Sequence, residues 1–345
     1  GFGLHESIFA ILDKQFDEIS LYDASVGLDK DAAPEDRAAV EDYLAGSPYL
    51  DRTLTGHQAL LDVSNGGMAY DAYLRTNSEL DTYRRFVDLR HRTDSAPVSL
   101  PDDGVIITEK LAELLEADVG DAITLDGDKR VEAVVADIVE NYAYHYVYLS
   151  EACYQALFGT APEDNVILLA YREDTSAAQS DAVSAELMAL DAVTSYSYIA
   201  TLRDSFTNSM VAIDYAVVII IMAAAALAFV VLYNLTNINI TERTRELATL
   251  KVLGFFDKET TAYVYRENVF LTIFGIVLGL VLGRLLHAWL VLTVEVDLVM
   301  FGRTAPPYAY VLAAALTVAF SVMVNIAAHF KLKKVDMVES LKTVE

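Results

Sequence analysis

The side chains whose types suit chemistry are few and widely separated in this 345-residue chain. His91 and His145 could each ligate a metal, but no further ligand stands at a suitable spacing around them. Cys153 has apolar neighbours in sequence, which favours a small buried residue over a reactive thiol. No nucleophile–base arrangement and no glycine-rich phosphate loop is recognisable. We therefore expect no enzymatic activity, no metal and no cofactor in this chain.

Four tyrosines alternate along one short segment. Tyr142, Tyr144, Tyr146 and Tyr148 occupy every second position of NYAYHYVYLS, and alternate residues of a strand point to the same face. Such a stripe packs in a core more often than it binds a ligand. We expect a strand whose tyrosine face packs in the core, with an aromatic or peptide ligand as the alternative.

A run of charges with interspersed leucines separates two apolar segments. Leu247, Leu250 and Leu253 recur at helical spacing within 240–256, which predicts a short amphipathic helix along a membrane surface. Its basic residues suit anionic lipid headgroups, but such a surface would repel Glu242 and Glu246. Anchoring to lipid and docking of a protein partner both remain open at this point.

Two features of the following apolar segment also stand out. Gly275, Gly279 and Gly283 are spaced by four, and small residues at this spacing let helix backbones approach closely. We expect them to pack against another helix. Arg284 follows them, and a charge within a membrane span is costly. Its alternatives are a role in transport, snorkelling, or pairing with Glu295 or Asp214.

The elements that must position these residues fall into two regions of different charge. The chain is 54% hydrophobic with a net charge of −25 and a mean hydropathy of +0.32. Residues 1–209 contain 39 acidic and 14 basic residues, whereas residues 210–345 contain 11 of each. So much negative charge disfavours nucleic-acid binding, and a single cysteine excludes an internal disulfide. An acidic domain joined to a membrane domain is the predicted organisation.

Three uncharged or nearly uncharged runs are long enough to cross a bilayer, at about 215–233, 269–293 and 308–330. The loop 234–267 and the tail after 330 are rich in lysine and arginine, whereas the loop between the second and third runs contains only Arg303. Basic loops face the cytoplasm. Three crossings then place residues 1–209 outside, so we expect a multi-pass membrane protein.

Periodicity within residues 1–209 predicts an α+β domain. Apolar residues at helical spacing in 1–21 indicate a stalk helix. Helices are expected at 34–47, 108–117 and 175–190, and strands at 58–63, 68–73, 104–107, 122–126, 131–140, 165–171 and 194–199. The domain boundaries are set at 22–204 for the α+β part and 205–345 for the membrane part, with a further span truncated before Gly1.

The cytoplasmic stretch resembles the FtsX-like permease family of ABC transporters. The matching positions are Asn237, Glu242, Arg243, Arg245, Glu246, Leu247, Leu250, Lys251, Leu253 and Gly254, followed by Arg266–Glu267–Asn268 and by DMVESLK at 336–342. Upstream, GVIITEKLAELLEADVGDAITL at 104–125 is similar to the extracellular domain of MacB-like proteins. Longer relatives, including BceB-like transporters of antimicrobial peptides, have additional spans, and this chain could be the C-terminal half of one.

The resemblance implies a function and a docking site. In the family, the loop is a coupling helix that docks on a cytoplasmic ATPase, which here would use Glu242, Arg243, Arg245, Glu246, Leu250, Lys251, Leu253 and Gly254. The ATPase would bind ATP and Mg²⁺ and would drive movement of the extracellular domain (mechanotransmission), with a second permease half or copy in the membrane. Peptides, lipids or lipoproteins are the expected substrates. The alternatives are an FtsX-type regulator of a cell-wall hydrolase, and a membrane-anchored sensor or adhesin without an ATPase.

Overall fold

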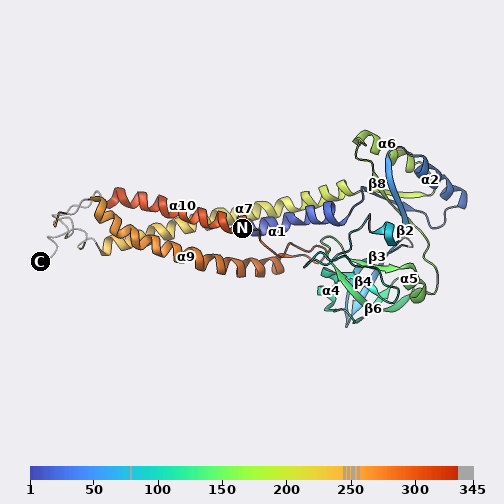
Figure 1. Ribbon diagram of the computed structural model, residues 1–345, viewed down its shortest axis with the longest axis horizontal. Helices are drawn as coiled ribbons and strands as arrows, with labels where there is room; N and C mark the ends of the chain where they lie inside the picture. Colours follow the sequence, from blue (N-terminus) through green and yellow to red (C-terminus); the bar gives the residue numbers. More distant parts are fainter. Residues whose placement is uncertain (78–79, 244–245, 247–248, 250–252, 255–256, 333–345) are drawn as a thin grey trace. The chain divides into compact units, whose positions relative to one another are not determined.

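The computed structural model describes residues 1–77, 80–243, 246, 249, 253–254 and 257–332 (Figure 1). Its contacts divide the chain into two units. The unit that we call the sheet unit comprises Phe9–Met210 and Glu295–Phe301. The helix unit comprises Gly1–Ile8, Val211–Val294 and Gly302–Glu345.

Three long helices supply the apolar part of the helix unit: α7 (Ile199–Glu242), α9 (Asp257–Val294) and α10 (Pro307–Leu332). Within them, Tyr215–Ile238, Val269–Val294 and Pro307–Ala327 are long and apolar enough to cross a membrane. At most 17% of the residues in any of these windows are buried. Helices that are apolar all round and exposed suit a lipid environment, so the three predicted spans are confirmed as helices.

One layer of the sheet unit is a four-stranded antiparallel sheet covered by helices. Its strands are β9 (Val193–Tyr198), β1 (Ala24–Leu28), β8 (Val166–Tyr171) and the first half of β2 (Leu50–Asn65), in that order. The helices α2 (Pro34–Gly46) and α6 (Ala177–Leu187) contribute Val40, Val183 and Leu187 to the core that they share with this sheet. A capping box between Ser176 and Gln179 begins α6.

The second layer is a closed barrel of six strands. The second half of β2 pairs with β3 (Met68–Asn77), and the ring continues through β7 (Tyr146–Ser150), β4 (Val105–Thr108), β6 (Arg130–Val139) and β5 (Ala122–Asp126) back to β2. From Arg130 to Val135, the residues of β6 are alternately exposed and buried, as the period of a strand requires. Two helices, α4 (Glu109–Leu115) and α5 (Glu151–Phe158), add Leu111, Leu115 and Cys153 to the barrel core.

Strand β2 belongs to both layers and joins them (Figure 1). Its 16 residues pair with β8 up to Gly56 and with β3 from His57 onward. A Cβ at Gly56 would lie 2.9 Å from the carbonyl oxygen of Thr76. Glycine is therefore required where the strand leaves one sheet and enters the other.

The remaining elements are α1 (Phe2–Asp13), the π-helix η1 (Lys14–Ile19) and the single turn α3 (Leu80–Tyr83). The expected α+β class is confirmed, together with most of the expected strands. The pattern missed β1, α5 and the first half of β2.

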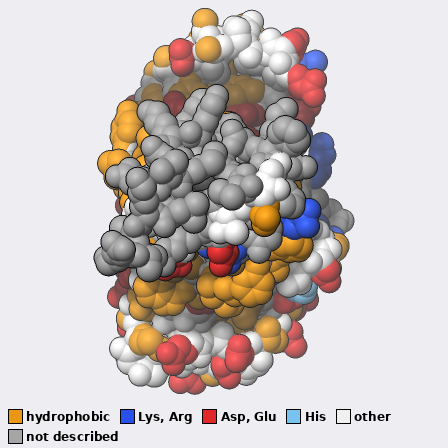
Figure 2. Space-filling view, turned by 90° about the vertical axis from the view of Figure 1, so that its left-hand side faces the viewer, with side chains coloured by type: hydrophobic (Ala, Val, Ile, Leu, Met, Phe, Trp, Pro, Cys, Tyr) orange, Lys and Arg blue, Asp and Glu red, His pale blue; other side chains and the backbone are white. Residues whose placement is uncertain are grey.

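In the view of Figure 2, acidic side chains are spread over the described surface, whereas basic ones are few.

Candidate functional site

An irregular segment between β6 and β7, residues 140–145, is buried although it is neither helix nor strand. We call it the hub. Glu140, Asn141, Tyr142, Ala143 and His145 are each at most 5% exposed. Buried irregular backbone must find hydrogen-bond partners outside regular structure. The partners of the hub come from segments far away in the sequence.

The hub corrects the prediction for the four tyrosines. Strand β7 begins only at Tyr146. Tyr144 has a φ of 61°, in the left-handed region that residues other than glycine rarely adopt. The four rings therefore do not share one strand face. Tyr146 and Tyr148 do stack on each other at 5.6 Å, whereas Tyr142 and Tyr144 belong to the hub.

The helix η1 contacts the hub through one side chain. Oε1 of Gln15 accepts hydrogen bonds from the backbone N–H groups of Tyr142 (2.8 Å) and Ala143 (3.2 Å). Gln15 is 4% exposed, and its Nε2 donates to the hydroxyl of Ser20. A π-helix widens the turn and is often found at functional positions. Here the π-turn holds an amide side chain against the hub.

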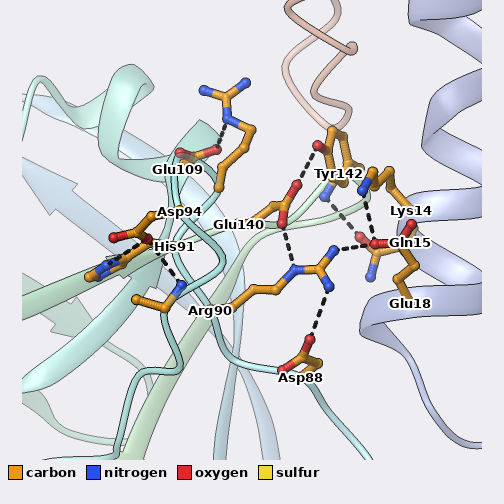
Figure 3. Close-up of polar contacts among 12 residues, drawn as sticks. Lys14, Gln15, Glu18, Asp88, Arg90, His91, Asp94, Glu109, Glu140 and Tyr142 are labelled. Atoms are coloured by element: carbon orange, nitrogen blue, oxygen red, sulfur yellow. Dashed lines mark hydrogen bonds and ion pairs between the residues drawn. The ribbon is translucent and has the colours of Figure 1, made fainter.

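An ionic network lies beside this contact (Figure 3). Nε of Arg90 donates to Glu140 at 2.8 Å, and the other guanidinium nitrogens donate to Asp88 and Glu18. The hydroxyl of Tyr142 donates to the second oxygen of Glu140 at 2.6 Å. Burial and this hydrogen bond to a carboxylate raise the pKa of Tyr142, so it stays a donor. Arg90 thus links the hub, through Glu140, to η1, through Glu18.

The segment that follows α9 contacts the hub from another part of the sequence. The carbonyl of Leu298 accepts from the N–H of Tyr144 (2.9 Å), and the N–H of Met300 donates to the carbonyl of Tyr142 (2.9 Å). The segment is also held by Glu295, whose Oε2 accepts from Nζ of Lys110 on α4 at 2.6 Å. The Glu295 side chain is 1% exposed, so this ion pair is buried.

The first turns of α7 form the third contact. The ring of Phe206 packs edge-on against Tyr144 of the hub, with centroids 5.7 Å apart. It also packs at a tilt against Phe16 of η1, with centroids 5.8 Å apart. Arg203 forms ion pairs with Asp17 (2.6 Å) and Asp13 (3.2 Å). The hub is therefore held by three segments, and each one continues in sequence into the helix unit.

Comparisons with known proteins bear on the C-terminal part of the chain. Residues 209–336 match the family model described as FtsX-like permease C-terminal. This part of the chain is similar to the C-terminal domain of FtsX-like permeases. It contains the three apolar helices, so the chain is a membrane protein. The resemblance predicted from the motif is confirmed.

Three solved structures with low identity and low TM-scores are among those similar to the chain. The periplasmic region of MacB from Actinobacillus actinomycetemcomitans is 12% identical, with a TM-score of 0.35, and the match covers 57% of this chain and 98% of that one. The extracellular domain of the noncanonic ABC-type transporter YknZ from Gram-positive bacteria is 15% identical, with a TM-score of 0.32 and coverages of 51% and 98%. A domain of a permease protein from Porphyromonas gingivalis is 13% identical, with a TM-score of 0.30 and coverages of 52% and 90%. No curated protein matches the sequence.

The predicted docking residues of the FtsX-like domain are described only in part. Glu242 ends α7, Arg243 is half-buried, and Glu246 is exposed. Leu253 is 70% exposed, and Gly254 has a φ of 93°, which favours glycine. Arg245, Leu250 and Lys251 lie outside the described residues. Docking on an ATPase therefore stays a prediction.

The glycines of the FtsX-like domain are open to approach. A Cβ added at Gly275, Gly279 or Gly283 meets no described atom within 4 Å. Their packing against another helix stays a prediction. Gly275 also lines a cavity of about 240 Å³ among α7, α9 and α10, where the hydroxyls of Thr272 and Ser321 are hydrogen-bonded at 2.9 Å.

The structure gives the partners of several other residues that the sequence analysis considered. Glu295, one candidate partner of Arg284, pairs with Lys110, and the side chain of the other, Asp214, is not described. Cys153 is buried, as predicted, and its thiol donates to the carbonyl of Gly104. His91 bonds Asp137 at 2.8 Å, and burial lowers the pKa of His145. No group of three or more metal-ligating side chains occurs among the described residues.

Two features of this site could not be found from the sequence. Gln15 and Arg90 carry no motif, and their partners in the hub are 127 and 50 residues away. In the sequence, only the alternating tyrosines marked the hub, and that alternation predicted a strand.

Proposed function

We propose that this chain is the permease subunit of an ABC transporter and that it couples a cytoplasmic ATPase to its sheet unit by mechanotransmission. The observation that supports the proposal is the hub. Three segments that continue into the helix unit meet on one buried, hydrogen-bonded segment of the sheet unit. A displacement of Gln15 or of the segment after α9 must break or move hydrogen bonds to the hub, and a displacement of α7 must move the ring of Phe206 that packs on Tyr144. Packed interiors deform in discrete steps.

The resemblance to FtsX-like permeases supports the remaining parts of the proposed transporter. The sheet unit lies outside a bacterial cell membrane, and loop 234–267 lies in the cytoplasm, where a separate ATPase binds ATP and Mg²⁺. A second permease half or copy completes the membrane part. The chain itself performs no catalysis. The proposed substrates are peptides, lipids or lipoproteins handled at the outer face. The spans contain few polar groups, which suits transmission of movement better than a hydrophilic channel.

The test combines partner capture with amide hydrogen exchange. The full-length protein is purified from its native membrane, as wild type, as Glu246→Lys and as Glu173→Lys. Glu173→Lys is the matched control, because Glu173 is an exposed glutamate of the sheet unit. Exchange at residues 140–145 is then measured with and without ATP and vanadate.

We expect an ATPase to copurify with wild type and Glu173→Lys but not with Glu246→Lys. Trapped nucleotide should change exchange at the N–H groups of Tyr142, Ala143 and Tyr144 only where the ATPase is present. An ATPase without any change at the hub would contradict mechanotransmission and leave docking intact. If no ATPase accompanies wild type, the permease role is wrong and a sensor or adhesin is favoured.

A further inference from the structure

One ring nitrogen of the buried His145 in the hub has no hydrogen-bond partner. His145 is 3% exposed, and its carbonyl accepts a hydrogen bond from the N–H of Tyr73 on β3 at 2.8 Å. The backbone of Asp297 lies close enough to the ring to hydrogen-bond with it. By contrast, Nδ1 is buried and has no partner among the described residues. Neutral imidazole leaves a bare acceptor there, whereas imidazolium has a donor at both nitrogens.

Charged groups from two other segments face this ring. Lys110 on α4 repels a positive charge on the ring, and Asp297 attracts one. Nζ of Lys110 is bonded to the buried carboxylate of Glu295 at 2.6 Å and lies 4.0 Å from the exposed carboxylate of Glu113. Burial, followed by the charge of Lys110, lowers the pKa of His145 from 6.5, so the ring is neutral at pH 7.

The segment that contributes Asp297 is residues 295–301, which we call the clasp. It contains neither a helix nor a strand. Val299 of the clasp forms an isolated antiparallel bridge with Ala143 of the hub. On either side of this bridge are the backbone hydrogen bonds of Tyr144 and Met300 that join the two segments. The clasp can therefore separate from the hub without breaking a sheet or a helix, and such segments open locally at low cost.

We propose that protonation of His145 opens the clasp, so that the hub is a switch that responds to mild acid. An imidazolium would place a second cation beside Lys110 and a buried Nδ1–H donor without an acceptor in its described surroundings. Both costs are removed when the clasp moves away and water reaches the ring. The opening does not require the permease role. In the proposed transporter, it would remove one of the three contacts that hold the hub.

The direction of the pH dependence follows from the lowered pKa. With the clasp open, the ring is solvated and takes up a proton with an ordinary histidine pKa of about 6.5. With the clasp closed, it takes up a proton only at lower pH. The closed form is therefore fully favoured above pH 6.5 and loses stability as the pH falls toward the closed-state pKa. At pH 5.0 the opening equilibrium can increase by at most about 30-fold.

The experiment measures amide hydrogen exchange of the full-length chain in lipid nanodiscs at pH 7.5, 6.5, 5.5 and 5.0. Each rate is divided by the intrinsic exchange rate at that pH, so that only opening is compared. The N–H groups of Tyr144 and Met300 report on the clasp, and that of Val135 on β6 is the internal reference. The variant His145→Gln takes up no proton in this range. His91→Gln is the matched control, because His91 lies in the sheet unit but outside the hub.

We expect corrected exchange at Tyr144 and Met300 to rise by about 3- to 30-fold from pH 7.5 to 5.0 in wild type and in His91→Gln. In His145→Gln the rise should stay below about twofold. No rise in wild type would overturn the proposal. An equal rise in His145→Gln would also overturn it, because another group, such as Glu295, would then be the one that titrates.

Two further readings separate opening of the clasp from general instability. An equal rise at Val135 in wild type would contradict the proposal, because the whole sheet unit would then be loosening. If His145→Gln does not fold, the ring of His145 is titrated by NMR in the wild-type chain. A measured pKa below 6.5, together with a rise confined to Tyr144 and Met300, would support the switch. A pKa of 6.5 or above would overturn it.

Discussion

Single side chains supply the hydrogen-bond partners that the backbone of the hub needs. Gln15 replaces a missing strand partner: one amide oxygen accepts from two consecutive backbone N–H groups that no ladder reaches. Asn141 does the same for the carbonyls, donating from Nδ2 to those of Ala143 and Tyr144 at 2.9 Å. Backbone that bends through a left-handed tyrosine can stay buried only because these amides complete its hydrogen bonds.

His91 makes a residue-scale prediction about pH. Its hydrogen bond to Asp137, followed by the charges of Asp137 and Asp94, raises its pKa above 6.5. A raised pKa stabilises the fold fully below pH 6.5, and that stability is lost as the pH rises through the folded-state value. We expect His91→Gln to reduce the free energy of unfolding at pH 6 by less than about 1 kcal/mol, because the pair is exposed.

The measurement is chemical denaturation of wild type and His91→Gln at pH 6, 7, 8 and 9. The difference between the two proteins should shrink steadily across this series. A difference that stays constant or grows with pH would show that His91 acts by packing and not by its charge.

At the scale of the element, the sequence pattern predicted the strands that their own residues define. It missed the strands that depend on pairing with other strands. Strands β3, β5 and β6 were expected close to where they lie, because their short apolar runs are bounded by glycine and aspartate turns. Strand β2 was expected only at 58–63, because its first half, DRTLTGH, has few apolar residues and gains its order from pairing with β8. Strand β1 contains serine and glycine, and only its neighbours β8 and β9 make it a strand. The hub depends on contacts between distant segments, which no local period contains.

The crossing of β2 between layers makes a prediction at Gly56. Replacing Gly56 with alanine places a Cβ 2.9 Å from the carbonyl oxygen of Thr76, and this atom belongs to a paired strand that cannot move freely. We expect a loss of about 1–3 kcal/mol in the free energy of unfolding. The matched control is Gly46→Ala at the end of α2, where an added Cβ meets nothing within 4 Å.

Urea unfolding of the two variants provides the measurement. Gly46→Ala should be neutral or slightly stabilising. If Gly56→Ala were as stable as wild type, the two layers would have to be able to shift against each other at this point.

At the scale of the whole molecule, charge distribution and hydropathy set the topology. The excess of acid lies entirely in residues 1–209, and the basic loop that follows α7 should stay in the cytoplasm. The single apolar window of α7, Tyr215–Ile238, then separates the sheet unit from Leu253 by one crossing. The chain offers a clean background for testing this, because its one cysteine, Cys153, is 3% exposed and burial raises its pKa.

Cysteines introduced at two exposed positions should therefore react from opposite sides of the membrane. Ser197→Cys on β9 should be labelled by a membrane-impermeant maleimide in right-side-out vesicles, and Leu253→Cys only in inside-out vesicles. Wild type, with Cys153 alone, should stay unlabelled in both and serves as the control. Labelling of both positions from the same side would contradict a crossing by α7. A reversed pattern would keep the crossing but place the basic loop outside, and an ATPase could then not reach Glu246.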